Sequence, residues 1–386
     1  MPGTESPPPS SYLTDENVTE FAKARRRVEA RVAGRLDDIR RGRAMDVLVP
    51  YAKAYLGLYL DLDNRIDPEQ RVRLLAGPEL ADAVLQGLHA APALDHGLEP
   101  RAVGRSMAAG EAPPAGFTIL AGMDRRFVDG TWEALPRERL AVALACRYAN
   151  RSNLRPRWAE ALRDQGAGLF PPVLAALWAG LVEAGERCLP ELRWALEHPA
   201  GEPVLEAGLE TLLASRVPWS DSQHRALTLR ALATVPAERL LEIATAQLDR
   251  AEEIPIRQQV GWHALAFLLD PVRHGPRLAA FCGQSRIKVL PLLDFVVAAL
   301  EGGPGRAPLD PGPEAIAQVL RIVAPAFSRN QHPQGGTDAI ARKVLWLFDR
   351  LGADPGPGAT AVIRRLGRVR VLRNYADVIE DLARGR

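Results

Sequence analysis

Between residues 220 and 300 the apolar positions recur at helical spacing, and caps or prolines separate one run from the next. Residues 220–223 read Ser-Asp-Ser-Gln, a capping box in which Ser220 and Gln223 satisfy backbone N–H groups at a helix start. Pro236 suits the first turn of the helix that follows it, and Pro255 breaks the chain before another apolar helix. The Gly-rich run that begins at Gly302 ends the series. The pattern predicts consecutive amphipathic helices joined by short connections.

These predicted helices form pairs with a period of roughly 35–40 residues, which is the spacing of HEAT-type and related repeats. No β-rich run with period-two alternation competes with this pattern. We therefore expect an all-α protein built as a HEAT-like α-solenoid or an irregular stack of helix pairs. An irregular helical bundle without a true repeat stays open as an alternative.

Changes in composition divide the chain into regions. Residues 1–11 are rich in Pro and Ser, which predicts a disordered tail. We expect an N-terminal helical region at 12–150, central helical repeats at 157–301 and a C-terminal helical region at 313–386. The polar stretch 150–157 and the Gly/Pro-rich stretch 302–313 separate them. The stretch 91–130 is the least regular, and we expect an exposed loop surface there.

Charge and composition favour a protein of the cytoplasm. The net charge is +2, so no global field favours nucleic acid or an anionic membrane. No apolar run approaches the roughly 20 residues that a membrane-spanning helix needs, and the N-terminus is unlike a signal peptide. The three cysteines, Cys146, Cys188 and Cys282, are far apart, and we expect reduced core residues in apolar helices.

Arginine is the dominant basic residue. Among 49 Lys and Arg side chains, only Lys23, Lys53, Lys288 and Lys343 are lysines, which is typical of a GC-rich bacterial genome. Clusters of arginine occur near both ends of the chain, with carboxylates between those near the N-terminus. The residues that we expect at a binding surface are Arg25, Arg26, Arg31, Arg101, Arg105, Arg125, Arg126, Arg364, Arg365 and Arg368.

Motifs that carry chemistry are missing from the sequence. It has no Walker A phosphate cradle, no G-x-S-x-G nucleophile elbow and no H-E-x-x-H zinc motif. The histidines are scattered, and no Cys-x-x-Cys pair suggests a zinc or redox site. The tryptophans are spread about once per helix pair, which favours packing anchors over a base-stacking platform. We expect no catalytic residues, no cofactor and no bound metal.

The stretch from Tyr51 to Leu300 resembles the helical domain that follows the NTPase in some bacterial NACHT/STAND-type defence proteins. The similarity rests on short helical motifs at 55–59, 71–75, 84–88, 258–262 and 268–271. The nucleotide-binding motifs of that family do not occur here. The resemblance implies a helical-repeat sensor that contacts a foreign protein, with an NTPase or effector chain as partner, and it carries over no catalytic residue.

Two functions of different class follow from these observations. The first is a non-enzymatic protein-interaction scaffold or sensor in bacterial antiviral defence, because stacked helices present an extended surface to another protein. The second is a nucleic-acid-binding α-solenoid, acting on DNA bases, which would need its arginines on one face without interleaved carboxylates and its tryptophans exposed.

Overall fold

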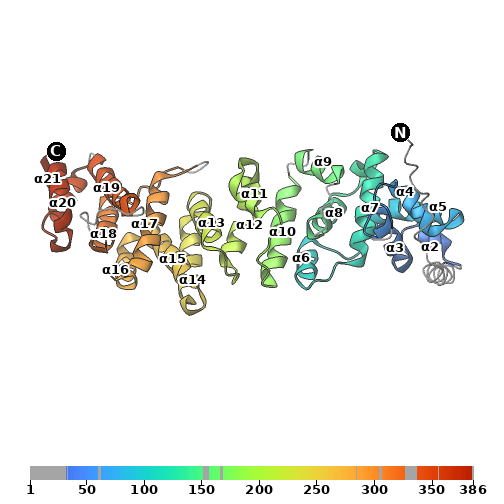
Figure 1. Cartoon of the computed structure of the whole chain (residues 1–386), viewed down its shortest axis with the longest axis horizontal. Coiled ribbons are helices and arrows are strands. Elements are labelled where there is room, and N and C mark those ends of the chain that lie inside the picture. Colours follow the sequence, from blue (N-terminus) through green and yellow to red (C-terminus); the bar gives the residue numbers. More distant parts are fainter. Residues whose placement is uncertain are drawn as a thin grey trace, which may run out of the picture. The chain divides into compact units, whose positions relative to one another are not determined.

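The computed structural model of this protein describes residues 32, 34–59, 62–150, 156–165, 168–283, 285–303, 307–326, 337–354 and 356–384. Throughout these ranges the fold is α-helical with short 3-10 turns and no β-strand, which confirms the predicted all-α class (Figure 1). The tail expected at 1–11 lies outside them. The chain divides into two compact units, one ending at Ala184 and one beginning at Gly185. The boundary predicted from the sequence at 150–157 lies between two helices of the first unit, before the division between the units.

The first unit consists of short helices, most of which begin at a proline or directly after one. Proline is favoured there because the first helical N–H has no intrahelical partner to lose. In chain order the helices are α2 (Leu36–Arg40), α3 (Met45–Tyr55), α4 (Pro68–Ala76), α5 (Pro78–Ala90), α6 (Pro100–Ala108), α7 (Pro114–Val128), α8 (Arg137–Ala149), α9 (Arg157–Gln165) and α10 (Phe170–Glu183).

Helices α2, α3, α4, α5 and α7 surround one hydrophobic core. Its largest fully buried side chains include Tyr51, Leu48 and Leu88. Further along, α8 packs on both α6 and α7, and α10 packs on α6 and α8. Most helices of the unit therefore bury their apolar stripes against several neighbours, which supplies the stability that a short helix lacks alone.

Glycines set the closest approaches between these helices. A Cβ on Gly104 of α6 would overlap the Leu177 carbonyl oxygen of α10, and one on Gly180 would overlap the Arg101 carbonyl oxygen. On the other side of the unit, a Cβ on Gly122 of α7 would overlap the Leu88 carbonyl oxygen of α5. Backbone therefore packs directly on backbone at these crossings, which only glycine permits.

The expectation of an irregular loop at 91–130 is wrong. Most of this stretch is helical, because Pro100 and Pro114 begin α6 and α7 instead of interrupting them. Gly104 and Gly122 lie within these helices at the close crossings described above. Pro100, Pro114, Gly104 and Gly122, which contributed to the expectation of a loop, are therefore helix starts and packing contacts.

The second unit contains the helices of the regular central pattern. They are α11 (Leu192–Glu197), α12 (Glu202–Ala214), α13 (Asp221–Thr234), α14 (Ala237–Leu248), α15 (Ile256–Leu269), α16 (Pro271–Cys282), α17 (Arg286–Glu301), α18 (Pro313–Val323), α19 (Thr337–Ala353), α20 (Pro357–Leu366) and α21 (Ala376–Arg384). The capping box at Ser220 and the cap at Asp270 are present as predicted. Pro291 lies inside α17, which continues through it.

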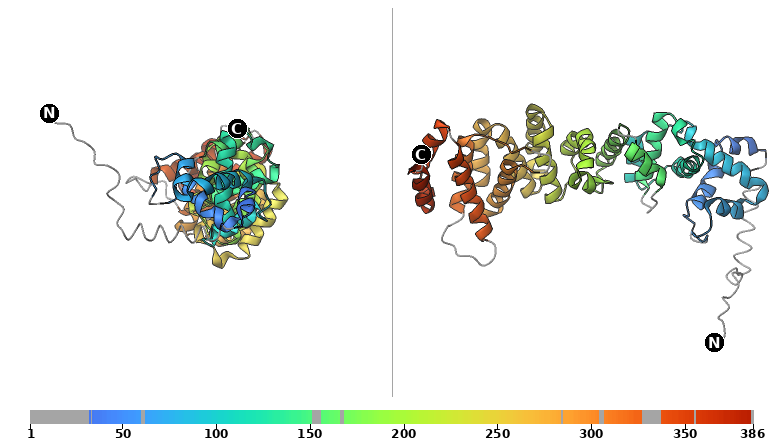
Figure 2. Two further views of the ribbon diagram at one scale, coloured as in Figure 1. Left: turned by 90° about the vertical axis from the view of Figure 1, so that its right-hand side faces the viewer. Right: turned by 90° about the horizontal axis from the view of Figure 1, so that it is seen from above.

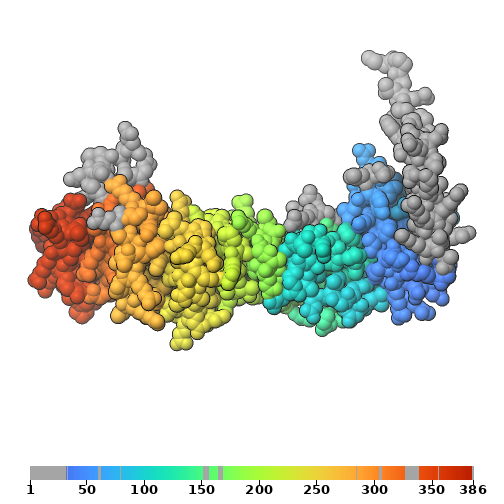
Figure 3. Space-filling view, turned by 90° about the horizontal axis from the view of Figure 1, so that it is seen from below, coloured from blue at the N-terminus to red at the C-terminus, as the bar shows by residue number. Residues whose placement is uncertain are grey.

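In this unit helices pack on the next helix and on the one after it. Odd-numbered helices make one row of contacts, from α13 to α15, α17, α19 and α21. Even-numbered helices contact one another from α12 to α14 and again from α16 through α18 to α20. Within the unit, the helices follow one another in chain order (Figure 2), and the coloured surface in Figure 3 shows the same order from yellow to red.

The prediction for the cysteines is correct for two of the three. Cys146 and Cys282 are buried in α8 and α16, but Cys188 is exposed and lies outside any helix. Its segment cannot continue α10 because Gly185 takes a positive φ of 79° directly after that helix. None of the helices described by the structure is both long and apolar enough to cross a bilayer.

The glycine crossings lead to a stability prediction. Replacing Gly180 with alanine places a methyl group against the Arg101 carbonyl oxygen, so α6 and α10 must separate. We expect Gly180→Ala to lower the free energy of unfolding by about 1–3 kcal/mol, seen as a lower urea midpoint by circular dichroism.

The control for this change is Gly116→Ala on α7, where the new Cβ would meet the Cys146 side chain at ordinary distances, 3.5 Å from its sulfur. Alanine there should be neutral or stabilise the helix by up to about 1 kcal/mol. Equal stability of the two variants would show that the close crossing does not constrain α6 and α10.

Candidate binding groove on helices α13, α15 and α17

The second unit carries a solvent-open groove with a volume of about 480 Å³. Its walls come from α13, α15 and α17, three consecutive members of the odd-numbered row. α13 and α17 also contact each other directly, so the groove lies where these two helices flank the start of α15. The lining residues are Asp221, Ser222, His224, Arg225, Arg257, Gln258, Gly261, Arg286, Ile287, Leu290, Pro291, Asp294 and Phe295.

Hydrogen bonds fix the helices that form the groove. Arg225 of α13 donates from Nη2 to the backbone oxygen of Asp294 on α17, at 3.1 Å. Gln258, which is buried, donates from Nε2 to the backbone oxygen of Trp219 at 2.5 Å and so ties the start of α15 to the segment before α13. The walls therefore have defined positions even though most of their polar side chains are exposed.

Three arginines face solvent around the groove, one from each helix: Arg225, Arg257 and Arg286. Arg257 pairs with Asp221 at 3.2 Å, and Arg286 donates from Nε to the Ala326 carbonyl oxygen at 3.0 Å. The other lining carboxylate, Asp294, is already paired with Lys343 of α19. Positive charge therefore exceeds negative charge along the groove.

The helix starts add to this positive field. Arg257 and Arg286 lie in the first turns of α15 and α17, and neither first turn contains an acidic residue. Cations are unfavourable there, because the backbone N–H groups already give a helix N-terminus a partial positive charge. An anionic group placed in the groove would relieve this repulsion.

Apolar side chains complete the groove. Leu290 and Pro291 of α17 are half-buried in its wall, and Phe295 is buried behind them. Ile287, one turn earlier, keeps 69% of its surface exposed. The groove therefore combines a cationic rim with an apolar strip, a combination suited to a protein segment that carries both acidic and apolar residues.

His224 forms part of the inner wall. It is buried, and its ring lies 5.0 Å from that of Trp262 in an edge-on arrangement. Gly261 makes room for it, since a Cβ there would come within 2.7 Å of the imidazole Cε1. Burial lowers the pKa of His224 to about 4, so the imidazole is neutral at pH 7 and adds no charge to the groove.

The arginines expected from the sequence do not line this groove. Arg101 and Arg105 lie on α6 and both pair with Glu183 of α10. Arg125 and Arg126 lie on α7, where Arg125 pairs with Glu69 and Arg126 donates from Nε to the His89 carbonyl oxygen. These four side chains bind parts of the first unit to one another.

The remaining expected arginines belong to the two ends of the chain. Arg364 and Arg365 end α20, and Arg365 pairs with Glu314 at the start of α18. Arg368 follows that helix and is exposed. Arg25, Arg26 and Arg31 lie outside the described residues.

Sequence reasoning missed the groove arginines because it searched for clusters along the chain. Arg225, Arg257 and Arg286 are roughly one helix pair apart in sequence and come together only when alternate helices align. For Arg257 and Arg286 a usable signal was present, because each is a basic residue in a helix first turn where acidic residues are preferred. Arg225 carries no such signal, since α13 begins with Asp221.

The described residues hold no group of three or more His, Cys, Asp or Glu side chains that could bind a metal ion. Burial raises the pKa of Cys146 to about 12 and that of Cys282 to about 11, so neither buried thiol is an activated nucleophile.

Comparison with known proteins adds no assignment. No protein-family model matches the chain, and neither the curated proteins nor the solved structures contain a match. The groove must therefore be interpreted from its own geometry and charge.

The buried imidazole predicts a specific dependence of stability on pH. The ordinary pKa of 6.5 applies in the unfolded chain, while the folded value is about 4, so between these values the unfolded chain binds an extra proton. The free energy of unfolding should therefore fall as the pH is lowered from 6.5 towards 4, by up to about 3 kcal/mol from this residue.

His224→Gln should reduce this slope in urea titrations at a series of pH values, while the part due to His263, whose pKa burial also lowers to about 4, should remain. The same change at exposed His198 of the same unit serves as control and should leave the slope as in the wild type. A slope in His224→Gln equal to that of the wild type would contradict the assignment of the effect to His224.

Proposed function

We propose that this protein is a HEAT-like α-solenoid that acts as a non-enzymatic protein-interaction scaffold or sensor, and that the groove on α13, α15 and α17 binds an acidic segment of its partner. The observation that carries the proposal is the groove itself, with one arginine from each of three alternate helices above an apolar strip. The two rows of helix contacts in the second unit support the solenoid part of the proposal.

The proposed occupant follows from charge and shape. A carboxylate between Arg225 and Arg257 can accept charge-assisted hydrogen bonds from both exposed guanidinium groups. An apolar side chain next to that carboxylate can cover Ile287 and Leu290, which water otherwise contacts. A short segment that alternates acidic and apolar residues therefore meets both requirements.

Nucleic-acid binding is the second candidate, because arginines bind phosphate as well as carboxylate. Two observations weigh against it. Several of the expected arginines pair with carboxylates, as at Glu183, Glu69 and Glu314. The tryptophans that could stack on bases are largely buried, including Trp132, Trp158, Trp178, Trp219 and Trp262.

The resemblance to helical domains of NACHT/STAND-type proteins supplies the biological setting of the proposal. On this basis we propose that the protein acts in the bacterial cytoplasm, in antiviral defence, and that it binds an NTPase or effector chain. Affinity purification of the tagged chain from its native host, with and without nuclease, tests this setting. A stoichiometric protein partner that survives nuclease supports it, and recovery of nucleic acid alone contradicts it.

Charge reversal in the groove provides the direct test. In Arg225→Glu/Arg257→Glu, repulsion replaces two charge-assisted contacts, so we expect recovery of the protein partner to fall at least tenfold. Fluorescence anisotropy with labelled poly-L-glutamate and with a single-stranded DNA oligonucleotide should show preference for the polypeptide in the wild type, and loss of that preference in the variant.

Arg193→Glu is the matched control, because Arg193 is exposed on α11 of the same unit and pairs along its own helix with Glu197. It changes the net charge in the same direction without touching the groove, so it should bind like the wild type. Equal losses in both variants would assign binding to net charge and overturn the groove as the site.

A further inference from the structure

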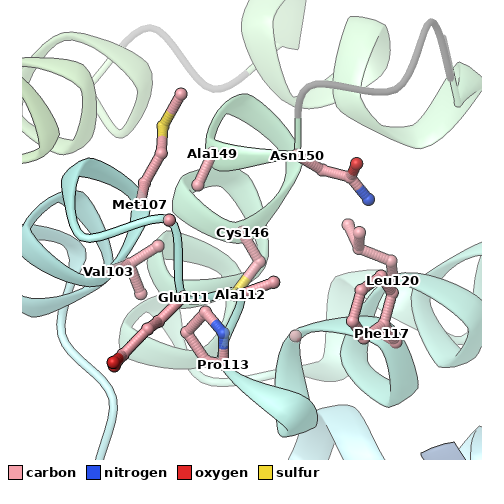
Figure 4. A pocket seen from close by; sticks show the side chains of 12 residues that line it. Val103, Met107, Glu111, Ala112, Pro113, Phe117, Leu120, Cys146, Ala149 and Asn150 are labelled. Atoms are coloured by element: carbon pink, nitrogen blue, oxygen red, sulfur yellow. The ribbon is translucent and has the colours of Figure 1, made fainter.

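The first unit contains a cavity of about 270 Å³ that is open to solvent and that the proposed function does not use (Figure 4). It lies between the C-terminal half of α6, the N-terminal half of α7 and the end of α8. Its walls are mainly carbon, with Val103 and Met107 on α6 and Phe117 and Leu120 on α7. Its apolar walls are therefore in contact with solvent, and a ligand that covered them would remove apolar surface from water.

Close helix crossings on both sides prevent this cavity from closing. α6 is fixed to α10 through the backbone contacts at Gly104 and Gly180, and α7 is fixed to α5 through that at Gly122. Both α6 and α7 rest on α8 while making little contact with each other. For the gap to close, either α6 would have to move away from α10 or α7 would have to move away from α5, and a backbone contact at a glycine would be lost.

The loop between α6 and α7 is also fixed. Gly110 donates its N–H to the Met107 carbonyl oxygen at 3.0 Å, and Glu111 donates its N–H to the Ser106 carbonyl oxygen at 2.8 Å. The ammonium group of Lys53, on α3, lies 4.8 Å from the centre of the Phe117 ring on α7 and so contacts that wall from outside the cavity lining. The cavity is therefore bounded by ordered structure on each of its three helices.

The lining carries little charge. Its one ionisable carboxylate, on Glu111, is exposed and lies away from Phe117 and Leu120, whereas the neutral Asn150 amide lies on the same side as Leu120 (Figure 4). A charged ligand would lose its hydration here without gaining a counter-charge. A neutral molecule would bury apolar surface against walls that already exist.

We propose that this cavity binds a small uncharged apolar molecule of about ten carbon atoms, aromatic or aliphatic. The size follows from volume, since a cavity of about 150 Å³ accommodates the six carbons of benzene. Because its three walls are fixed in place, the cavity is formed before the ligand arrives. This site is independent of the groove in the second unit and of the partner proposed for it.

The test uses the full chain with naphthalene as probe and naphthalene-2-sulfonate as its charged counterpart of the same ring size. Probe fluorescence should give an affinity for naphthalene at least tenfold higher than for the sulfonate. Hydrogen exchange read by mass spectrometry should slow in peptides that cover 103–120 and 142–150, and it should not change in the second unit. Failure of naphthalene to bind, equal binding of both probes, or protection elsewhere would overturn the proposal.

Ala149→Phe places a phenyl ring in the cavity and should weaken naphthalene binding at least tenfold. Ala134→Phe, at an exposed position of the same unit, is the matched control and should bind like the wild type. Circular dichroism confirms that each variant is folded, and Gly116→Leu, also in the lining, replaces Ala149→Phe if that variant does not fold. Unchanged binding in a folded lining variant would show that naphthalene binds elsewhere and would refute the site.

Discussion

The fold depends on the packing of the apolar faces of short helices against neighbouring helices. A helix of nine to fourteen residues, such as α6 or α10, is marginal in water and becomes stable only through packing. In the first unit this requirement is met by close crossings at glycine, where backbone meets backbone. In the second it is met by contacts to the next helix and to the one after it. The groove and the cavity lie where neighbouring helices leave part of these apolar faces uncovered.

The two hollows arise from different causes. The groove forms because α13 and α17 contact each other and flank the start of α15, and its surface is open and cationic. The cavity forms because α6 and α7 are fixed from opposite sides and cannot approach each other. One therefore offers charge and a strip of apolar surface to a flexible chain, and the other offers a preformed apolar space to a small molecule.

The sequence allowed the all-α class and the helices from Ser220 onward to be predicted, because periodicity and caps are local signals. The stretch 91–130 was predicted wrongly, since a glycine at a helix crossing looks in sequence like a glycine in a loop. Gly104 and Gly122 are required because the carbonyl groups of Leu177 and Leu88 lie against them, and these contacts form only in the folded structure. Likewise, Arg225 and Arg257 become neighbours only through the packing of alternate helices, which no local pattern specifies.

The contact pattern of the second unit also bears on how the chain is made. Synthesis proceeds from the N-terminus, and α15, for example, packs on α13 and α14, which have already left the ribosome. Each new helix therefore finds part of its apolar stripe covered as soon as it emerges, without waiting for a distant strand or domain. Contacts between near neighbours in sequence also lower the entropy cost of closing loops, which favours rapid folding. An architecture of this kind limits the time for which a nascent chain exposes its hydrophobic surface.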